Sequence, residues 1–281
     1  LSAMGRLIAG IAHELNNPLQ NVAGYSELLS RSQAPASADD LRTQLVARYL
    51  YEHLFLAHLH FGGGEARDFY RLVRSRTPAP EPVDEVVTVR PFDDPQVPRV
   101  FYRFVRLTEV IVHKTHVPFL LDDAKLKRFR QLFLEPQWTV AALPSWEPEV
   151  AANPFVAFAA IPARARYQFM LDDAYYHVRA FIHGPVCKGQ IALNVIDEHF
   201  WVMFLAPDSD LSITDPEFLP LAAKDLRLPA QGGDTLEAMY GRFKLSQLSY
   251  VKKRNAAYQR ARHQGRQLGD LWDGGGTQRD A

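Results

Sequence analysis

The sequence predicts an α+β fold with a helical majority and short strands, preceded by an isolated amphipathic helix at the N-terminus. Helices are predicted at residues 40–61, where apolar residues recur at helical spacing, at 122–134, which opens with two aspartates, and at 235–264. Between the first two of these segments, short runs of β-branched and aromatic residues alternate with proline-rich loops, which favours strands. The composition, with 47% apolar and 23% charged residues, is typical of a globular protein that buries a sizeable core.

The first predicted element is the N-terminal helix. Apolar residues from Met4 to Leu29 recur at helical spacing, and His13 lies off that stripe. The segment HELNNPL at residues 13–19 resembles the phosphoacceptor box of sensor histidine kinases. This resemblance implies that His13 takes a phosphoryl group while Glu14 accepts the ring proton. The alternative is an ordinary amphipathic helix with one surface histidine. No second bundle helix or nucleotide-binding loop follows, so we do not expect kinase activity.

The composition changes after residue 32, where SRSQAPASADD is rich in serine, alanine, aspartate and proline. We therefore divide the chain into a kinase-like helix (residues 1–32), a linker or join (residues 33–41) and a second domain (residues 42–281). The join is interpreted either as a true fusion or as an artefact of gene assembly, and we favour the artefact.

The second predicted helix, residues 40–61, carries three histidines. On a helix, His53 and His60 share a face but lie about 10 Å apart along the axis, and His58 points elsewhere. One metal ion could not bind all three, so we interpret them as polar or hydrogen-bonded side chains on a half-buried helix.

Short strands are predicted next, at residues 69–73, 86–89, 100–107 and 110–112. If the last strand continues, His113 and His116 point to opposite faces, because their offset is odd. They could act together only if the backbone turns at residues 114–115. We nevertheless take His113 and His116 as the best local candidates for a catalytic or cofactor-contacting site, with hydrogen bonding to buried backbone as the alternative.

A helix is predicted from Asp122 to Leu134, with acidic residues at its N-terminus. Residues 149–200 then form the densest apolar region, in which aromatic side chains alternate with arginines. These residues are interpreted either as core or as the lining of an acyl-chain channel, where Arg164 and Arg166 would bind lipid phosphate. Cys187 is a third candidate for substrate binding, although a packed small side chain is the commoner role.

The last predicted helix, residues 235–264, combines lysine and arginine with tyrosine and phenylalanine. A basic aromatic helix can lie on anionic lipid headgroups. A solvated face on a structural helix is the alternative.

Long stretches between residues 42 and 207 carry a family resemblance. They read RTQLVARYLYEHLFLAHLHF, IVHKTHVPFLL, NPFVAFAAIPARARYQFMLDDA and GPVCKGQIALNVIDEHFWVMF. The chain resembles the bacterial fatty acid cis/trans isomerases in these stretches. The resemblance implies conversion of cis to trans double bonds in membrane phospholipid acyl chains, in the periplasm, as a response to solvent or heat stress. It also implies a haem c attached through a CxxCH motif.

The cysteine count conflicts with that cofactor. Thioether attachment needs two cysteines and a histidine ligand, whereas Cys187 is the only cysteine and is followed by Lys188 and Gly189. We therefore expect an internal fragment of a haem-dependent isomerase that binds no haem and is inactive alone. The alternatives are a truncated histidine kinase with phosphoacceptor His13, and a lipid-surface binding module without catalysis.

Charge and hydropathy limit the partners. The 32 Lys and Arg residues balance the 32 Asp and Glu residues, so no overall charge attracts nucleic acid. The longest apolar run, residues 154–161, is shorter than the roughly 20 residues of a transmembrane helix. Residues 1–30 show no signal-peptide pattern, so the periplasmic location comes from the resemblance alone. No pattern in the sequence sets an oligomeric state.

Overall fold

The computed structural model describes residues 24–26, 29, 38–62, 68–183, 204–228, 236–262 and 271–272. Within these residues the predicted α+β fold with a helical majority is confirmed. The chain divides into two compact units. Unit 1 comprises residues 1–91, 95–141 and 175–198, and unit 2 comprises residues 92–94, 142–174 and 199–281.

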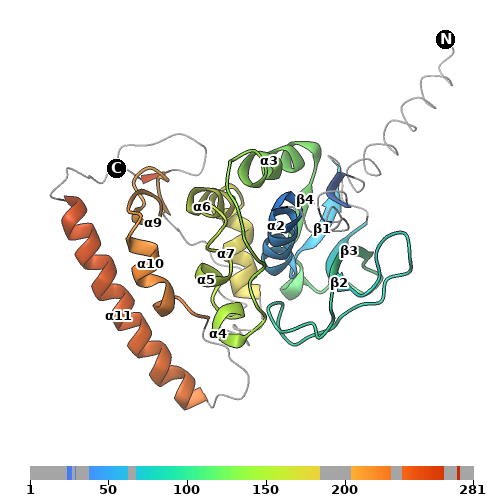
Figure 1. The fold of residues 1–281 in the computed structure, drawn as a ribbon. Helices are drawn as coiled ribbons and strands as arrows, with labels where there is room; N and C mark the ends of the chain where they lie inside the picture. Colours follow the sequence, from blue (N-terminus) through green and yellow to red (C-terminus); the bar gives the residue numbers. More distant parts are fainter. Residues whose placement is uncertain are drawn as a thin grey trace, which may run out of the picture. The chain divides into compact units, whose positions relative to one another are not determined.

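Unit 1 is built on a four-stranded mixed sheet (Figure 1). The strands are β1 (His58–Phe61), β2 (Tyr70–Ser75), β3 (Phe101–Arg106) and β4 (Pro118–Leu121). Their order is β3-β2-β1-β4, in which β1 runs parallel to β4 and antiparallel to β2, and β2 runs antiparallel to β3. The two strands predicted near residues 69–73 and 100–107 are thereby confirmed as β2 and β3.

Helices α2 (Ala38–Leu54) and α3 (Asp123–Phe133) pack on one face of this sheet. Side chains alternate along a strand, so Leu59 and Leu121 both point to that face, where each is at most 1% exposed. A narrow apolar cavity remains between the sheet and the helices. Its lining comprises Tyr25, Leu29, Leu50, Leu54, Leu59, Leu72, Phe104, Leu121 and Phe129.

The start of α3 follows directly from its sequence. The Asp122 carboxylate accepts a hydrogen bond from the Lys125 backbone N–H at 2.8 Å, which caps the helix as its acidic N-terminus predicted. The Tyr25 hydroxyl donates to the Asp122 carbonyl at 2.8 Å. At the other end, Arg42 donates to the Leu134 carbonyl at 2.9 Å. Both ends of α3 are therefore tied to residues more than 90 positions earlier in the chain.

The helix predicted over residues 40–61 is wrong in its last part. Helix α2 ends at Leu54, and residues 58–61 form β1. The His58 backbone N–H donates to the Val117 carbonyl at 2.9 Å, and β1 then pairs residue by residue with β4. Pairing with a distant segment thus outweighs the local helical spacing.

Two of the predicted strands are also corrected. Residues 110–112 form no strand, because they lie exposed ahead of the 3₁₀ turn η2 (His113–Thr115), and the strand begins only at Pro118. Residues 86–89 contribute only loop, next to an isolated bridge between Ser75 and Glu85. Residues 110–112 are exposed β-branched residues with no described strand beside them to pair with. Of residues 86–89, Val86 is buried and its backbone N–H donates to the Arg74 carbonyl of β2 at 2.8 Å, but this contact does not extend into a strand.

Helix α7 (Ala174–His183) completes the described part of unit 1. The Tyr176 hydroxyl donates to the His53 carbonyl at 2.9 Å, and its ring packs edge-on against Phe119 at 4.8 Å between centroids. Arg179 lies one turn further along α7.

Unit 2 consists mostly of short helices. They are α4 (Pro148–Ala151), α5 (Pro154–Ala157), α6 (Ala163–Asp172), α9 (Leu211–Thr214), α10 (Phe218–Ala222), the 3₁₀ turn η3 (Ala223–Asp225) and the long α11 (Leu236–Arg262), with the strand pair β5 (Phe204–Leu205) and β6 (Leu271–Trp272). The helix predicted at residues 235–264 is confirmed as α11.

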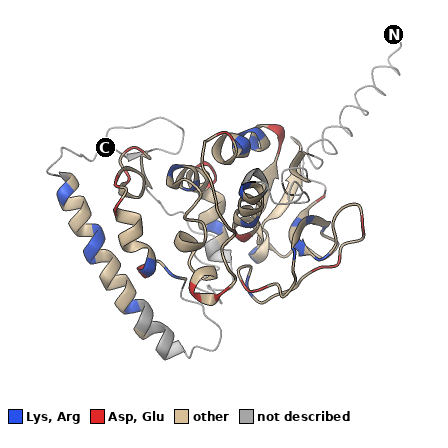
Figure 2. Cartoon of the chain, in the orientation of Figure 1, with Lys and Arg blue, Asp and Glu red and all other residues tan. Residues whose placement is uncertain are grey.

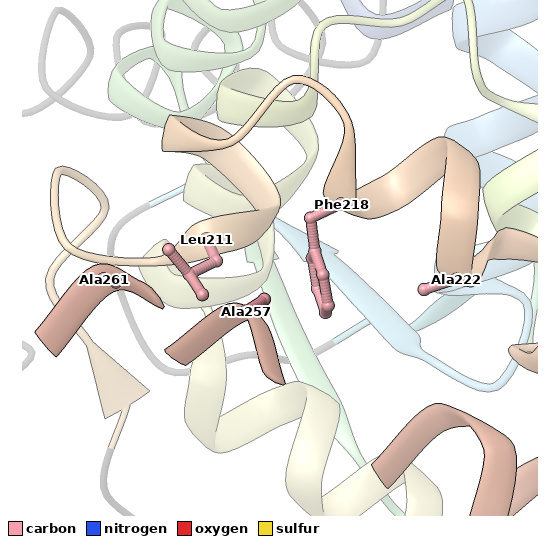
Figure 3. Packing of buried hydrophobic residues seen from close by; sticks show 5 residues of the cluster. All are labelled: Leu211, Phe218, Ala222, Ala257 and Ala261. Atoms are coloured by element: carbon pink, nitrogen blue, oxygen red, sulfur yellow. The ribbon is translucent and has the colours of Figure 1, made fainter. Parts of the chain in front are cut away.

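The inner side of α11 packs on α9 and α10. Figure 3 shows this cluster, which comprises Leu211, Phe218, Ala222, Ala257 and Ala261. Elsewhere in unit 2, Phe158 and Phe169 have no exposed surface, as expected if the aromatic residues of this region are core. No described helix of either unit is long and apolar enough to cross a membrane.

Candidate functional site

Three histidines gather on the sheet face opposite α2 and α3, and we name His58, His60 and His116 the histidine cluster. His58 and His60 flank Leu59 on β1, so both side chains point away from the helices. His116 lies between η2 and β4, the strand that pairs with β1. The Nδ1 atoms of His58 and His116 are 2.7 Å apart, so one ring donates a hydrogen bond to the other.

Phe69 lies beside all three rings. Its centroid is 4.9 Å from that of His116, 5.7 Å from that of His60 and 6.3 Å from that of His58. The His116 and His60 rings meet it nearly edge-on, an arrangement that suits the positive edge and negative face of aromatic rings. Phe69 therefore provides an apolar ring against which all three histidines pack.

The environment keeps all three imidazoles neutral near pH 7. Burial is the main cause that lowers the pKa of each histidine. The pKa of His58 and His60 is lowered further by His116, and the pKa of His116 by Arg179 and His113. Glu109 opposes this by raising the pKa of His58. Shifted histidines that are half-buried at one place are typical of functional sites.

Beside the cluster lies an exposed apolar segment, residues 110–112. Val110, Ile111 and Val112 are 90%, 44% and 57% exposed. Contiguous exposed apolar surface can mark a site of interaction with a partner, a membrane or a ligand. Positive charge accompanies them, because Lys114 lies on η2 and Arg179 is close enough to lower the pKa of His116.

Comparison with known proteins gives one family match. A family model described as fatty acid cis/trans isomerase (CTI) matches residues 18–281. The chain belongs to this family. No curated protein and no solved structure matches the chain. The match begins at residue 18, within the predicted kinase-like helix of residues 1–32. The division of the chain into this helix, a linker and a second domain stays a prediction.

The structure places His113 at the start of the turn η2 and His116 directly after it. The backbone does turn at residues 114–115, as their joint action would require, since η2 covers these residues. The His116 ring hydrogen-bonds to the His58 ring, and the His116 backbone N–H donates to the His113 carbonyl at 3.3 Å, while the His113 side chain is exposed. The contribution of His58 was missed because residues 58–61 were expected to be helical. The alternation in HLHF was the available signal, and it is only four residues long.

The other predicted site residues lie elsewhere. Arg164 on α6 is exposed and forms an ion pair with Asp208. Arg166 donates from Nε to the Ile161 carbonyl at 3.0 Å, and its guanidinium lies over the Phe155 ring. Both arginines belong to unit 2, and their role in binding lipid phosphate stays a prediction. His13 and Cys187 lie outside the described residues.

His53, the remaining histidine of the predicted helix, has a structural contact. Its Nδ1 donates to the Tyr49 carbonyl at 2.7 Å, one turn earlier in α2. Its ring meets that of His177 edge-on at 6.1 Å. The expectation that His53 is hydrogen-bonded on a half-buried helix is confirmed.

A buried charged cluster lies on the helix side of the sheet. Arg74 has no exposed surface, and Arg48 bonds to Glu52 at 2.8 Å with both side chains at most 7% exposed. Burial raises the pKa of Glu52 to about 7, although Arg48 and Arg74 oppose the shift. The Arg74 guanidinium also lies over the Tyr51 ring at 5.4 Å and hydrogen-bonds to Thr88. This cluster joins β2 to α2.

The residues present do not fit a haem c. Its attachment needs two cysteines, and the sequence has one. Among the residues that the structure describes, no three histidine, cysteine, aspartate or glutamate side chains converge to hold a metal ion. The histidine cluster offers a hydrogen-bonding site rather than a complete ligand set.

Proposed function

We propose that this chain takes part in converting cis double bonds to trans in the acyl chains of intact membrane phospholipids, together with a segment that carries haem c. The observation that carries the proposal is the family match over residues 18–281. In line with the sequence resemblance, we place this activity in the periplasm and in the response to solvent or heat stress.

We further propose that the histidine cluster binds the polar part of the lipid. The Nδ1 atom of His60 is buried and has no hydrogen-bond partner among the described residues, so an ester or phosphate oxygen that displaces the groups covering it would satisfy it. Lys114 and Arg179 supply the positive charge that a phosphate prefers. The exposed segment 110–112 supplies apolar surface for the adjoining acyl chain.

The cluster acts by positioning and not by proton transfer to the double bond. An isolated alkene is an extremely weak base, and a neutral imidazole is a poor acid, so the driving force for protonation is strongly unfavourable. The lowered pKa of each histidine also leaves little of the protonated imidazolium, which would be the stronger acid, near pH 7. Rotation about the double bond therefore needs an electronic step that the cluster does not supply.

Family activity depends on haem c, as the resemblance implies, and the residues of this chain do not fit that group. We therefore expect the 281-residue chain to form no trans acyl chains by itself. Activity is expected when a CxxCH-bearing segment from a family member is joined to it.

The experiment compares both proteins in a bacterial host whose phospholipids contain only cis double bonds. Fatty acid methyl esters are separated by gas chromatography, and the trans to cis ratio is measured. In the joined protein, His116→Gln is expected to lower the trans to cis ratio at least about tenfold. This is the effect expected from the loss of one hydrogen bond to a charged or buried group. Lys127→Gln, an exposed change on α3, serves as the matched control and is expected to leave the ratio unchanged.

Two results would contradict the proposal. If the haem-loaded joined protein forms no trans acyl chains, the isomerase assignment fails. If the protein is active but His116→Gln and His58→Gln match the control, the assignment stands and the role of the histidine cluster is refuted.

A further inference from the structure

The outer side of α11 carries an arrangement that the site in unit 1 does not explain. From residue 241 to residue 262 the sequence has seven Lys and Arg residues and no Asp or Glu. Over the whole chain the two charge types balance at 32 each, so this helix concentrates positive charge locally. Figure 2 shows Lys and Arg in blue along the described part of α11.

The inner side of α11 uses part of this charge within unit 2. Lys253 pairs with Asp225 of η3, to which Ser249 also donates at 2.9 Å. Arg260 lies 3.7 Å from Asp215. Together with the buried Ala257 and Ala261, these contacts fix which side of α11 faces α9 and α10.

Among the residues that the structure describes, the outer side of α11 makes no such ion pairs. Lys244, Leu248 and Lys252 follow one another at four-residue intervals, so they form one stripe along the helix. Leu245 lies next to this stripe. Leu245 and Leu248 are 70% and 59% exposed, and both lysines are exposed without an acidic partner among the described residues. We name these four residues the outer stripe.

We propose that the outer stripe binds the surface of an anionic phospholipid bilayer, with the leucines inserted among the lipids and the lysines at the phosphates. Exposed leucine is unfavourable in water and favourable at the headgroup and acyl boundary. Lysines that flank it complement anionic lipid, and each strengthens binding about fivefold near such a surface. Residues 244–252 of α11 offer both within about two turns of the helix.

An acidic protein partner fits the stripe less well. Such an interface would place acidic groups against the lysines, but the two leucines would then need a separate apolar pocket between them. A bilayer meets both requirements without a specific shape. Membrane binding through the outer stripe would bring the protein to its lipid substrate, and in this respect it rests on the proposed function. The binding itself does not depend on isomerase activity.

The test is co-sedimentation of the full chain with vesicles, which does not measure isomerisation, so the two proposals can fail separately. One set of vesicles is pure phosphatidylcholine, and the other also contains phosphatidylglycerol. We expect binding to the anionic vesicles only, weakened by added salt. The double variant Lys244→Gln/Lys252→Gln is expected to bind about 25-fold more weakly. Leu245→Ser/Leu248→Ser is expected to bind about tenfold more weakly.

The matched control removes two exposed positive charges from α3 through Lys127→Gln/Arg130→Gln. It is expected to bind like the unchanged protein, and circular dichroism verifies that every variant is folded. Absence of binding to anionic vesicles overturns the proposal, as does equal weakening by the control. A fall in the solution mass of the Leu245→Ser/Leu248→Ser variant without vesicles also overturns it, because the stripe would then bind a second copy of the chain.

Discussion

We predict that acid destabilises unit 1 because His177 is buried as a neutral imidazole. His177 lies on α7 beside the rings of Tyr176 and His53, at 5.0 and 6.1 Å. Burial, with smaller contributions from His53 and Lys125, lowers its pKa from 6.5 to about 3. The unfolded chain therefore takes up a proton near pH 6.5, and the folded chain does not. The stability is complete above that pH and is lost as the pH falls towards 3.

The size of the effect follows from the two pKa values. Each pH unit below 6.5 costs about 1.4 kcal/mol of unfolding free energy, so the loss at about pH 5 is about 2 kcal/mol. His177→Phe keeps a ring at this position and removes the titration. Glu52, whose pKa is raised to about 7, contributes with the opposite sign, because its protonation favours the folded state. It does so equally in both proteins and cancels in their difference.

The assay is urea denaturation, followed by circular dichroism, at about pH 7.5 and about pH 5. The loss of stability on acidification is expected to be about 2 kcal/mol smaller in His177→Phe than in the unchanged protein. His113→Gln, a change at an exposed histidine, provides the comparison. Equal acid dependence in His177→Phe and the unchanged protein would refute the reasoning, because burial of a neutral imidazole would then not be coupled to folding.

Three further predictions concern the packing of α3, each measured by urea denaturation at neutral pH. Asp122→Ala removes the cap on Lys125 and is expected to lower the unfolding free energy by about 1 kcal/mol, and no more effect than Asp123→Ala would contradict the cap. Tyr25→Phe deletes one hydrogen bond to the Asp122 carbonyl and is expected to cost about 1 kcal/mol; an unchanged midpoint would show that the bond is not needed. Phe133→Ala empties a fully buried position and is expected to cost about 3 to 5 kcal/mol, so a loss below about 1 kcal/mol would contradict its place in the core.

The helices with clear local signals could be predicted from the sequence. Asp122 marks the start of α3 because its side chain can satisfy a backbone N–H of the first turn, whatever the rest of the fold. The long α11 is also predictable, since its residues are strong helix formers over many turns. Both signals are contained within one segment of chain.

The histidine cluster could not be predicted in the same way. His58 and His116 are 58 positions apart, and their contact depends on the parallel register of β1 and β4. In the sequence, leucines near His58 also recur at helical spacing, so the helix and the strand compete locally. Only the pairing with residues 118–121 decides between them, and one sequence does not reveal which strands pair.

The most direct test of the central claim is isomerisation in D₂O by the haem-loaded joined protein. Vesicles of a cis-monounsaturated phospholipid are the substrate, and the mass of the trans product is measured. Because the histidine cluster positions the lipid and does not protonate the double bond, the account predicts trans phospholipid that carries no deuterium in its acyl chain. Deuterium incorporated into the trans chain, or no trans product at all, would contradict it.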